Sequence, residues 1–189
     1  MKNASFFLAA VHRDLRARWR HSVWLGAGTT LLGLGLGAVF FYAGLQKHLA
    51  PFQFAEAVMG YRLLPQALVG VVAAVVPWVE LITGFLLVVG YLGEVLGRML
   101  TALGLDSGRF LLGGVKRRSC LLILTGLEAV FTLVMVVTVA RGLKIDCGCG
   151  LLFQREVGPA AISENLLTLV LAAFLYWLAL PAGENAIKV

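Results

Sequence analysis

Two cysteines separated by one glycine, Cys147-Gly148-Cys149, are the residues of this sequence best suited to chemistry. They lie in the segment Lys144-Ile145-Asp146-Cys147-Gly148-Cys149-Gly150, shortly after an apolar stretch that ends near Ala140. Glycine accepts the unusual backbone dihedrals that a tight disulfide ring demands. Strained or exposed disulfides have high reduction potentials and are typically the labile, catalytic ones. The spacing therefore predicts a thiol–disulfide redox pair.

A structural disulfide and a metal site are the alternatives for this pair. Closing so short a loop adds little chain-entropy stabilisation, which argues against a purely structural staple. Two cysteines with no histidine nearby leave tetrahedral zinc two ligands short, so no metal site is expected. The flanking charges oppose one another, since Arg141 and Lys144 would favour a thiolate and Asp146 would disfavour it. Whether the pair is catalytic or structural stays open.

The composition indicates the class of protein that contains these cysteines. Of the 189 residues, 60% are hydrophobic and 14% are charged, and the mean hydropathy is +0.90. A soluble domain has about a quarter of its residues charged, so an integral membrane protein in contact with the lipid bilayer is expected. In such a protein the net charge of +6 reports orientation, and no nucleic-acid partner is expected.

Four apolar segments predict four transmembrane helices, at about residues 23–45, 67–92, 119–140 and 162–180. The predicted fold class is an all-α membrane protein, a four-helix bundle in one domain over residues 23–181. A cytoplasmic amphipathic arm (1–22) and a short cytoplasmic tail (182–189) flank it. Residues 95–114 are expected to form a second interfacial segment. Glycines in the first helix should allow close helix approach: Gly33, Gly35 and Gly37.

The basic residues predict the orientation of the bundle. Eleven Lys and Arg residues fall in the N-terminal arm, the loop between the second and third helices and the tail, whereas five fall on the opposite side. The positive-inside rule then places both termini in the cytoplasm. Cys147 and Cys149 would face the periplasmic side of a bacterial inner membrane, where disulfides persist. Cys120 begins the third helix at the other end, so it cannot pair with them within the chain.

Carboxylates inside the predicted helices are candidates for function because they are costly to bury in lipid. Glu80 follows Pro77 and Trp78 in the second helix. It could relay protons, contact a quinone together with Trp78, pair with Lys47, or simply lock the bundle by a structural hydrogen bond. Glu128 in the third helix is expected to be structural.

Polar and aromatic residues also gather near the outer ends of the first two helices. They are Tyr42, Lys47 and His48, followed by Phe52, Phe54 and Arg62. Anchoring at the membrane interface is one interpretation. The other is that they form the rim of a pocket beside the cysteines, in which His48 assists thiol deprotonation.

Several motifs together resemble a known family. They are Phe41-Tyr42-Ala43-Gly44-Leu45-Gln46-Lys47, Pro51-Phe52, Tyr61-Arg62-Leu63-Leu64-Pro65, Pro77-Trp78-Val79-Glu80-Leu81 with Gly84, Arg141-Gly142-Leu143, Asp146-Cys147-Gly148-Cys149-Gly150 and Asn165-Leu166. In order and spacing, over roughly residues 24–180, the chain resembles the DoxX-like membrane proteins, in particular the branch of the methylamine-utilisation protein MauE.

The resemblance implies a four-helix inner-membrane protein tied to thiol–disulfide chemistry. MauE-like proteins are associated with maturation of methylamine dehydrogenase beside a thioredoxin-like partner, and related members pass electrons between sulfur compounds and quinone. The leading hypothesis is an electron relay in which Cys147 and Cys149 exchange with a thioredoxin-like or substrate protein. A partner or quinone must take the other half of the reaction, because the chain lacks a second dithiol. The alternative is a non-catalytic accessory subunit of a larger membrane complex.

Overall fold

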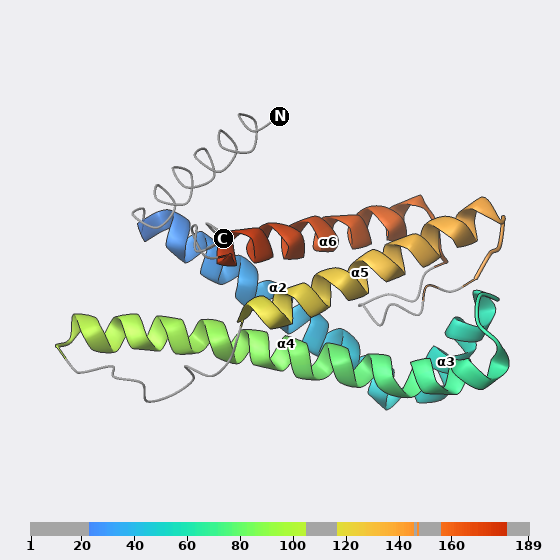
Figure 1. Ribbon diagram of the computed structural model, residues 1–189, viewed down its shortest axis with the longest axis horizontal. Coiled ribbons are helices and arrows are strands. Elements are labelled where there is room, and N and C mark those ends of the chain that lie inside the picture. The colour runs from blue at the N-terminus through green and yellow to red at the C-terminus, as the bar shows by residue number, and fades with distance from the viewer. Residues whose placement is uncertain (1–22, 105–116, 146, 148–155, 181–189) are drawn as a thin grey trace, which may run out of the picture.

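The computed structural model describes residues 23–104, 117–145, 147 and 156–180, most of them in helices (Figure 1). The helices are α2 (Val23–Leu49), α3 (Pro51–Gly60), α4 (Gln66–Ala102), α5 (Arg117–Ala140) and α6 (Pro159–Ala179). Within the described residues, α2, α4, α5 and α6 are long and apolar enough to cross a membrane. The predicted fold class, an all-α bundle of four transmembrane helices, is confirmed.

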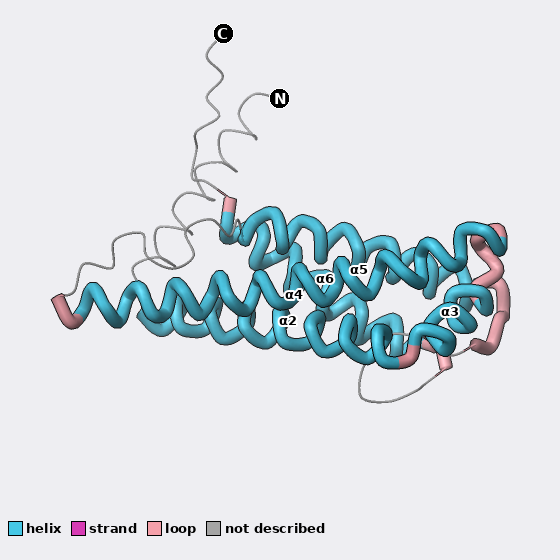
Figure 2. Tube along the Cα trace, turned by 90° about the horizontal axis from the view of Figure 1, so that it is seen from below, coloured by secondary structure: helices cyan, strands magenta, loops and turns pink. Residues whose placement is uncertain are grey.

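The long helices form an elongated bundle of two antiparallel pairs. α2 packs along α4, and α5 packs along α6 (Figure 1 and Figure 2). The short helix α3 lies at one end of the bundle together with the end of α5 and the start of α6 (Figure 1). We call this the α3 end. It is the end at which Cys147 is located, because Cys147 lies between α5 and α6.

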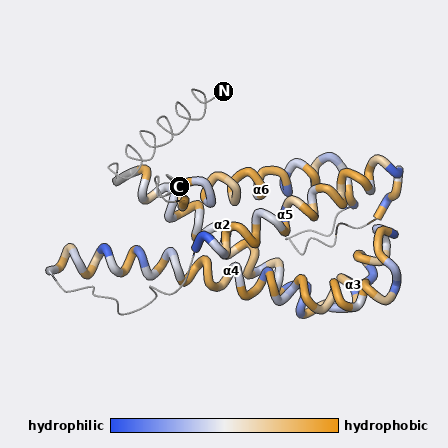
Figure 3. The backbone as a smooth tube through the Cα atoms, viewed as in Figure 1, coloured by the Kyte–Doolittle hydropathy of each residue, from blue (hydrophilic) through white to orange (hydrophobic). Residues whose placement is uncertain are grey.

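Apolar side chains cover the lateral surface of the bundle. Hydrophobic residues follow the length of the long helices (Figure 3). Large apolar side chains are exposed on each of them, including Leu31, Val71, Leu133 and Leu167. Exposed leucines and valines on this scale are stable when they face lipid. The chain is therefore a multi-pass membrane protein whose lateral surface contacts the bilayer.

Glycines bring α2 and α4 into close contact. A Cβ atom added to Gly84 would lie 2.5 Å from the backbone nitrogen of Phe41, and one added to Gly37 would lie 3.0 Å from the carbonyl oxygen of Gly84. Such contacts require small residues on both helices. The prediction is confirmed for Gly33 and Gly37, which face α4. It is wrong for Gly35, which is exposed and where an added Cβ atom would have nothing within 4 Å.

Two helix boundaries differ from the sequence prediction. α4 continues to Ala102, about ten residues beyond the expected end, and so includes residues 95–102, which were expected in a separate interfacial segment. Glu94 supports this extension, because it pairs with Arg98 one turn later at 2.6 Å and also with Arg117 at the start of α5. α2 likewise continues to Leu49, so Lys47 is helical rather than part of an outer loop.

The helix α3 was not predicted. It begins at Pro51, whose fixed φ angle suits the first helical position. Phe54 and Val58, one turn apart, bury against Val69 of α4, whereas Phe52 is exposed. Residues 51–60, part of the stretch interpreted as interfacial, thus form a short amphipathic helix that packs against α4 at this end of the bundle.

Candidate functional site

Cys147 is buried in a small apolar cluster at the α3 end. Its neighbours are Tyr61, Met135, Val157 and Ala161, which come from the α3–α4 connection, α5 and the start of α6. Only 5% of Cys147 is exposed. The expected redox pair therefore has one member held inside the protein rather than on a free loop.

Hydrogen bonds fix the backbone around Cys147. The hydroxyl of Tyr61 donates to the carbonyl oxygen of Cys147 at 2.6 Å. Arg141 donates to the carbonyl oxygens of Tyr61 and Arg62, at 3.2 and 3.3 Å. The amide of Val157 donates to the carbonyl oxygen of Ile145 at 2.8 Å, closing the base of the loop that contains the cysteines. Two connections far apart in the sequence are thereby tied together.

Tyr61 is suited to this role by its protonation state. Burial raises the pKa of Tyr61 to about 12, because an ionised phenolate would be poorly solvated there. The hydroxyl consequently keeps its hydrogen at physiological pH and can donate to Cys147. The sequence did not predict Tyr61 as a site residue, although it belongs to the motif Tyr61-Arg62-Leu63-Leu64-Pro65.

The structure describes only some of the other residues predicted at the cysteine site. Asp146 and Cys149 lie outside the described residues. Lys144 is exposed. Arg62 is exposed as well and adopts a left-handed backbone with φ of 51°, and it takes part in the Cys147 network through its carbonyl oxygen.

His48, Trp78 and Tyr42 lie on the lateral surface of the bundle. The ring of His48 packs edge-on against Trp78, with centroids 4.4 Å apart. Tyr42 is exposed and accepts a hydrogen bond from Gln46 at 2.7 Å. His48 and Tyr42 thus make separate contacts on this surface, and their role in a pocket rim beside the cysteines stays a prediction.

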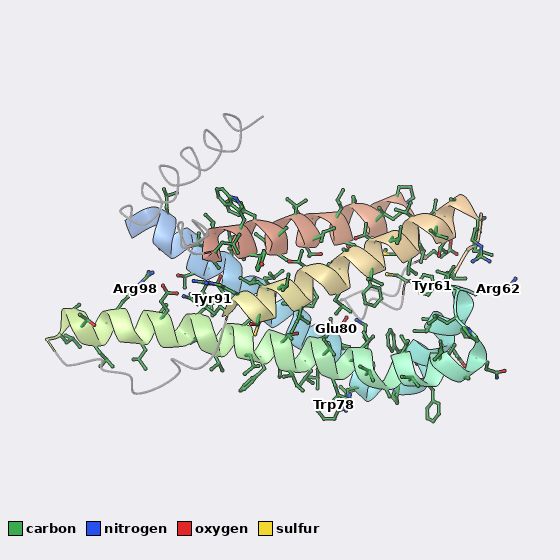
Figure 4. The ribbon with its side chains drawn as sticks, viewed as in Figure 1. Tyr61, Arg62, Trp78, Glu80, Tyr91 and Arg98 are labelled. Carbon is green, nitrogen blue, oxygen red and sulfur yellow. The ribbon has the colours of Figure 1, made fainter. Side chains whose placement is uncertain are left out.

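Trp78 and Glu80 point to different sides of α4 (Figure 4). Trp78 is 51% exposed, whereas Glu80 is 2% exposed, as expected for residues two positions apart on a helix. A quinone in contact with Trp78 would thus be separated from the Glu80 carboxylate by α4 itself.

Glu80 forms a buried ion pair with Lys47. The Lys47 ammonium lies 2.6 Å from each oxygen of the Glu80 carboxylate, and both side chains are almost fully buried. Aromatic rings of Phe54 and Phe131 flank the ammonium, with each centroid 5.4 Å from Nζ. The pairing with Lys47, one of the roles expected for Glu80, is therefore observed, whereas the proton relay and the quinone contact stay predictions. Because Lys47 is buried in this pair, it no longer counts among the five basic residues that the sequence assigned to the outer side.

A second carboxylate, Glu128, lies beside this pair. It is buried on α5 and interacts electrostatically with both Glu80 and Lys47. The hydroxyl of Thr168 on α6 lies 2.7 Å from its Oε2 atom. Asn165, one turn earlier on α6, donates to Thr132 at 2.7 Å. We call Lys47, Glu80, Glu128 and Thr168 the intramembrane cluster; its members come from all four long helices.

Cys120 lies far from Cys147. It is a buried, free thiol near the start of α5, in an apolar cluster with Leu121 and Leu124. Most of the 24-residue helix α5, roughly 30 Å of it, separates the two cysteines. Among the described residues, no group of three or more His, Cys, Asp or Glu side chains could hold a metal ion.

The fold and these two sites define the class of protein. It is a small helical membrane protein with a charged cluster inside the bundle and an anchored cysteine at one end. The family model described as methylamine utilisation protein MauE matches residues 24–178, so the chain belongs to the MauE family. Comparisons with curated proteins and with solved structures give no significant match. The wider resemblance to DoxX-like proteins stays a prediction.

Proposed function

We propose that this MauE-family protein is a membrane thiol–disulfide redox protein. In this proposal Cys147 and Cys149 form a disulfide on the periplasmic side of a bacterial inner membrane. The pair exchanges electrons with a thioredoxin-like or substrate protein, and a protein partner or a membrane quinone takes the other half of the reaction. The observation that carries the proposal is the anchoring of Cys147 by Tyr61 and by the Ile145–Val157 hydrogen bond.

The burial of Cys147 suggests which sulfur reacts with the partner. Thiol–disulfide exchange requires a thiolate to reach the sulfur that it attacks, and Cys147 is 5% exposed. A client thiolate would therefore attack the sulfur of Cys149. The bond between Cys147 and Cys149 breaks, and Cys147 leaves with the electron pair as a thiolate.

The remaining steps complete the transfer. A second thiolate of the client then attacks the client sulfur that is bonded to Cys149, and Cys149 leaves as a thiolate. The client is then a disulfide, and the pair has gained two electrons and takes up two protons. The partner or quinone reoxidises the pair by accepting these electrons and protons. The same steps in reverse reduce a client.

Family membership supports a biological setting for this chemistry. The family description refers to methylamine utilisation, which favours an accessory membrane protein in that process. The resemblance to DoxX-like proteins favours sulfur redox chemistry in particular. Both sources favour an accessory role for this membrane protein.

A second candidate function is a non-catalytic subunit of a larger membrane complex. The same burial of Cys147 favours it, because a structural disulfide would also be enclosed and anchored. In this case the Cys147–Cys149 bond would hold the loop between α5 and α6, and it would resist mild reductants.

Trapping of mixed disulfides separates the two functions. In the reducing direction the Cys149 thiolate attacks a client disulfide, and Cys147 then attacks Cys149 and releases the client, so in cells Cys147→Ser should accumulate a covalent adduct with a periplasmic protein at Cys149. Cys149→Ser should form none, and Cys120→Ser is the matched control that should leave client oxidation unchanged. Unchanged client redox states in both Cys147→Ser and Cys149→Ser would exclude the relay and favour the structural role.

A further inference from the structure

We propose that Glu128 is an intramembrane proton-binding site, which carries a proton while the neighbouring Lys47–Glu80 pair is ionised. The ligand of this site is a single exchangeable proton on a carboxyl group at the junction of the four long helices. The inference is independent of the cysteines and of the proposed redox function. Three observations carry it: the charges of the cluster, the hydrogen atoms available to Glu128, and the lack of a described donor to one of its oxygens.

The charges of the intramembrane cluster require a proton. Two carboxylates and one ammonium would leave a net negative charge among buried side chains, and an uncompensated charge is strongly unfavourable there. Lys47 contacts both oxygens of Glu80 at 2.6 Å, which is the geometry of an ionised carboxylate receiving a charged donor. The neutralising proton therefore belongs to Glu128.

No other charge faces Glu128 from the described parts of the helices packed around it. α2 contributes Lys47 and α4 contributes Glu80, which already neutralise each other. In the described part of α6 the neighbouring polar side chains are Asn165 and Thr168, which are uncharged. The glutamate of that helix, Glu164, is exposed. An ionised Glu128 would thus depend on sharing the single ammonium.

The hydrogen bonds of Thr168 fit a protonated Glu128. The Thr168 hydroxyl has one hydrogen but two strong acceptors in range, Oε2 of Glu128 at 2.7 Å and the carbonyl oxygen of Asn165 at 2.8 Å. A carbonyl can only accept. When Thr168 donates to Asn165, the short contact with Glu128 requires the hydrogen to come from the carboxyl group.

The second oxygen of Glu128, Oε1, accepts no hydrogen bond from the described residues. Glu128 is 6% exposed. A buried carboxylate normally recruits several donors, whereas a carboxylic acid needs fewer. The site is therefore built for the neutral acid, and release of its proton changes the net charge of the cluster by one.

Infrared spectroscopy of the full-length protein in phospholipid vesicles tests this assignment. A protonated carboxyl group gives a C=O stretching band distinct from that of carboxylates, and it shifts in D₂O. At neutral pH the wild-type protein should show such a band from a buried carboxyl group, and Glu128→Gln should lose it. Glu56→Gln, which changes an exposed glutamate on α3, is the matched control and should keep the band.

Changes to the ion pair give a second, independent readout. In Glu80→Gln the Lys47 ammonium needs another partner, so Glu128 should ionise and the band should disappear. In Lys47→Met both carboxyl groups should be neutral, so the band should grow about twofold. Where Lys47→Met does not assemble, Lys47→Met/Glu80→Gln removes both charges together and should retain the single band. A band that survives in Glu128→Gln, or that is unchanged in Glu80→Gln, overturns the proposal.

Discussion

At the scale of single residues, the protein separates two kinds of chemistry. Cys147 lies at the α3 end, where Tyr61 holds its carbonyl oxygen. Lys47 and Glu80 lie inside the bundle, where each compensates the charge of the other. Within the described structure, the first site is organised by hydrogen bonds to backbone carbonyl oxygens and the second by side-chain charge, so they should respond to different substitutions.

Removal of the Tyr61 hydroxyl should loosen the loop that contains the cysteines. In Tyr61→Phe the carbonyl oxygen of Cys147 loses its buried donor, which we expect to cost about 1–3 kcal/mol locally. Limited proteolysis of the α5–α6 loop in detergent should become faster. Tyr42→Phe, at an exposed tyrosine, is the control and should behave as wild type. Equal proteolysis of Tyr61→Phe and wild type would contradict the anchoring role.

The same hydroxyl predicts how the loop responds to pH. The pKa of Tyr61 is raised from 10.0 to about 12 in the folded protein, so its contribution is complete below pH 10 and is lost as the pH rises through about 12. Proteolysis of the loop should therefore accelerate over this alkaline range in wild type. Tyr61→Phe should lack this transition, and a transition that persists in it would exclude Tyr61 as its source.

At the scale of elements, the contacts that position both sites come from helix packing. α2 and α4 approach closely through Gly37, Gly44 and Gly84, which brings Lys47 against Glu80. α6 is tied to α5 through Asn165 and Thr168, which contact Thr132 and Glu128. The helix pairs thus present their polar residues to a common interior.

A methyl group at the α2–α4 contact should separate these helices. In Gly84→Ala the new Cβ would lie 2.5 Å from the backbone nitrogen of Phe41, and relieving such overpacking typically costs about 1–3 kcal/mol. Gly35→Ala adds the same atom where nothing lies within 4 Å. Unfolding in mixed micelles should show destabilisation of Gly84→Ala alone. Equal stability of the two variants would contradict the close packing.

The sequence predicted the elements better than their ends. Long apolar runs identify transmembrane helices, because lipid excludes any other spanning backbone. They do not show where a helix ends once it has left the hydrocarbon region. The extension of α4 to Ala102, through polar positions such as Glu94 and Arg98, was therefore not predicted. The short helix α3 was not predicted because it is stabilised by tertiary contacts of Phe54 and Val58 with α4.

The candidate sites were predictable in part for a similar reason. Glu80 is recognisable as a costly intramembrane charge, but its pairing with Lys47 depends on how α2 and α4 pack, since the two residues are 33 positions apart in sequence. Glu128 was expected to be structural, and its relation to Lys47 and Thr168 can be seen only in the folded structure. Tyr61 has no sequence pattern that reveals a partner 86 residues away.

At the scale of the whole molecule, the proposed function depends on orientation in the membrane. With Lys47 buried, the basic residues that the sequence still assigns to the outer side are Arg62, Arg141, Lys144 and Arg155. The excess of basic residues on the opposite side, which predicts that the α3 end faces the periplasm, is therefore larger than in the count from the sequence alone.

Labelling of single cysteines should reveal this orientation. In a background without native cysteines, Lys144→Cys should react with a membrane-impermeant maleimide in intact cells. Leu103→Cys, at the opposite end and 72% exposed, should react only after the membrane is permeabilised. The reverse pattern would contradict a periplasmic position for Cys147 and Cys149.

The reduction potential of the Cys147–Cys149 pair tests the central proposal most directly. It can be measured in the purified protein by equilibration with glutathione buffers, followed by thiol alkylation and mass analysis of the peptide that contains both cysteines. A redox relay should have a potential between about −120 and −270 mV, the range of thiol oxidoreductases. A potential below about −300 mV, typical of structural disulfides, would contradict the relay.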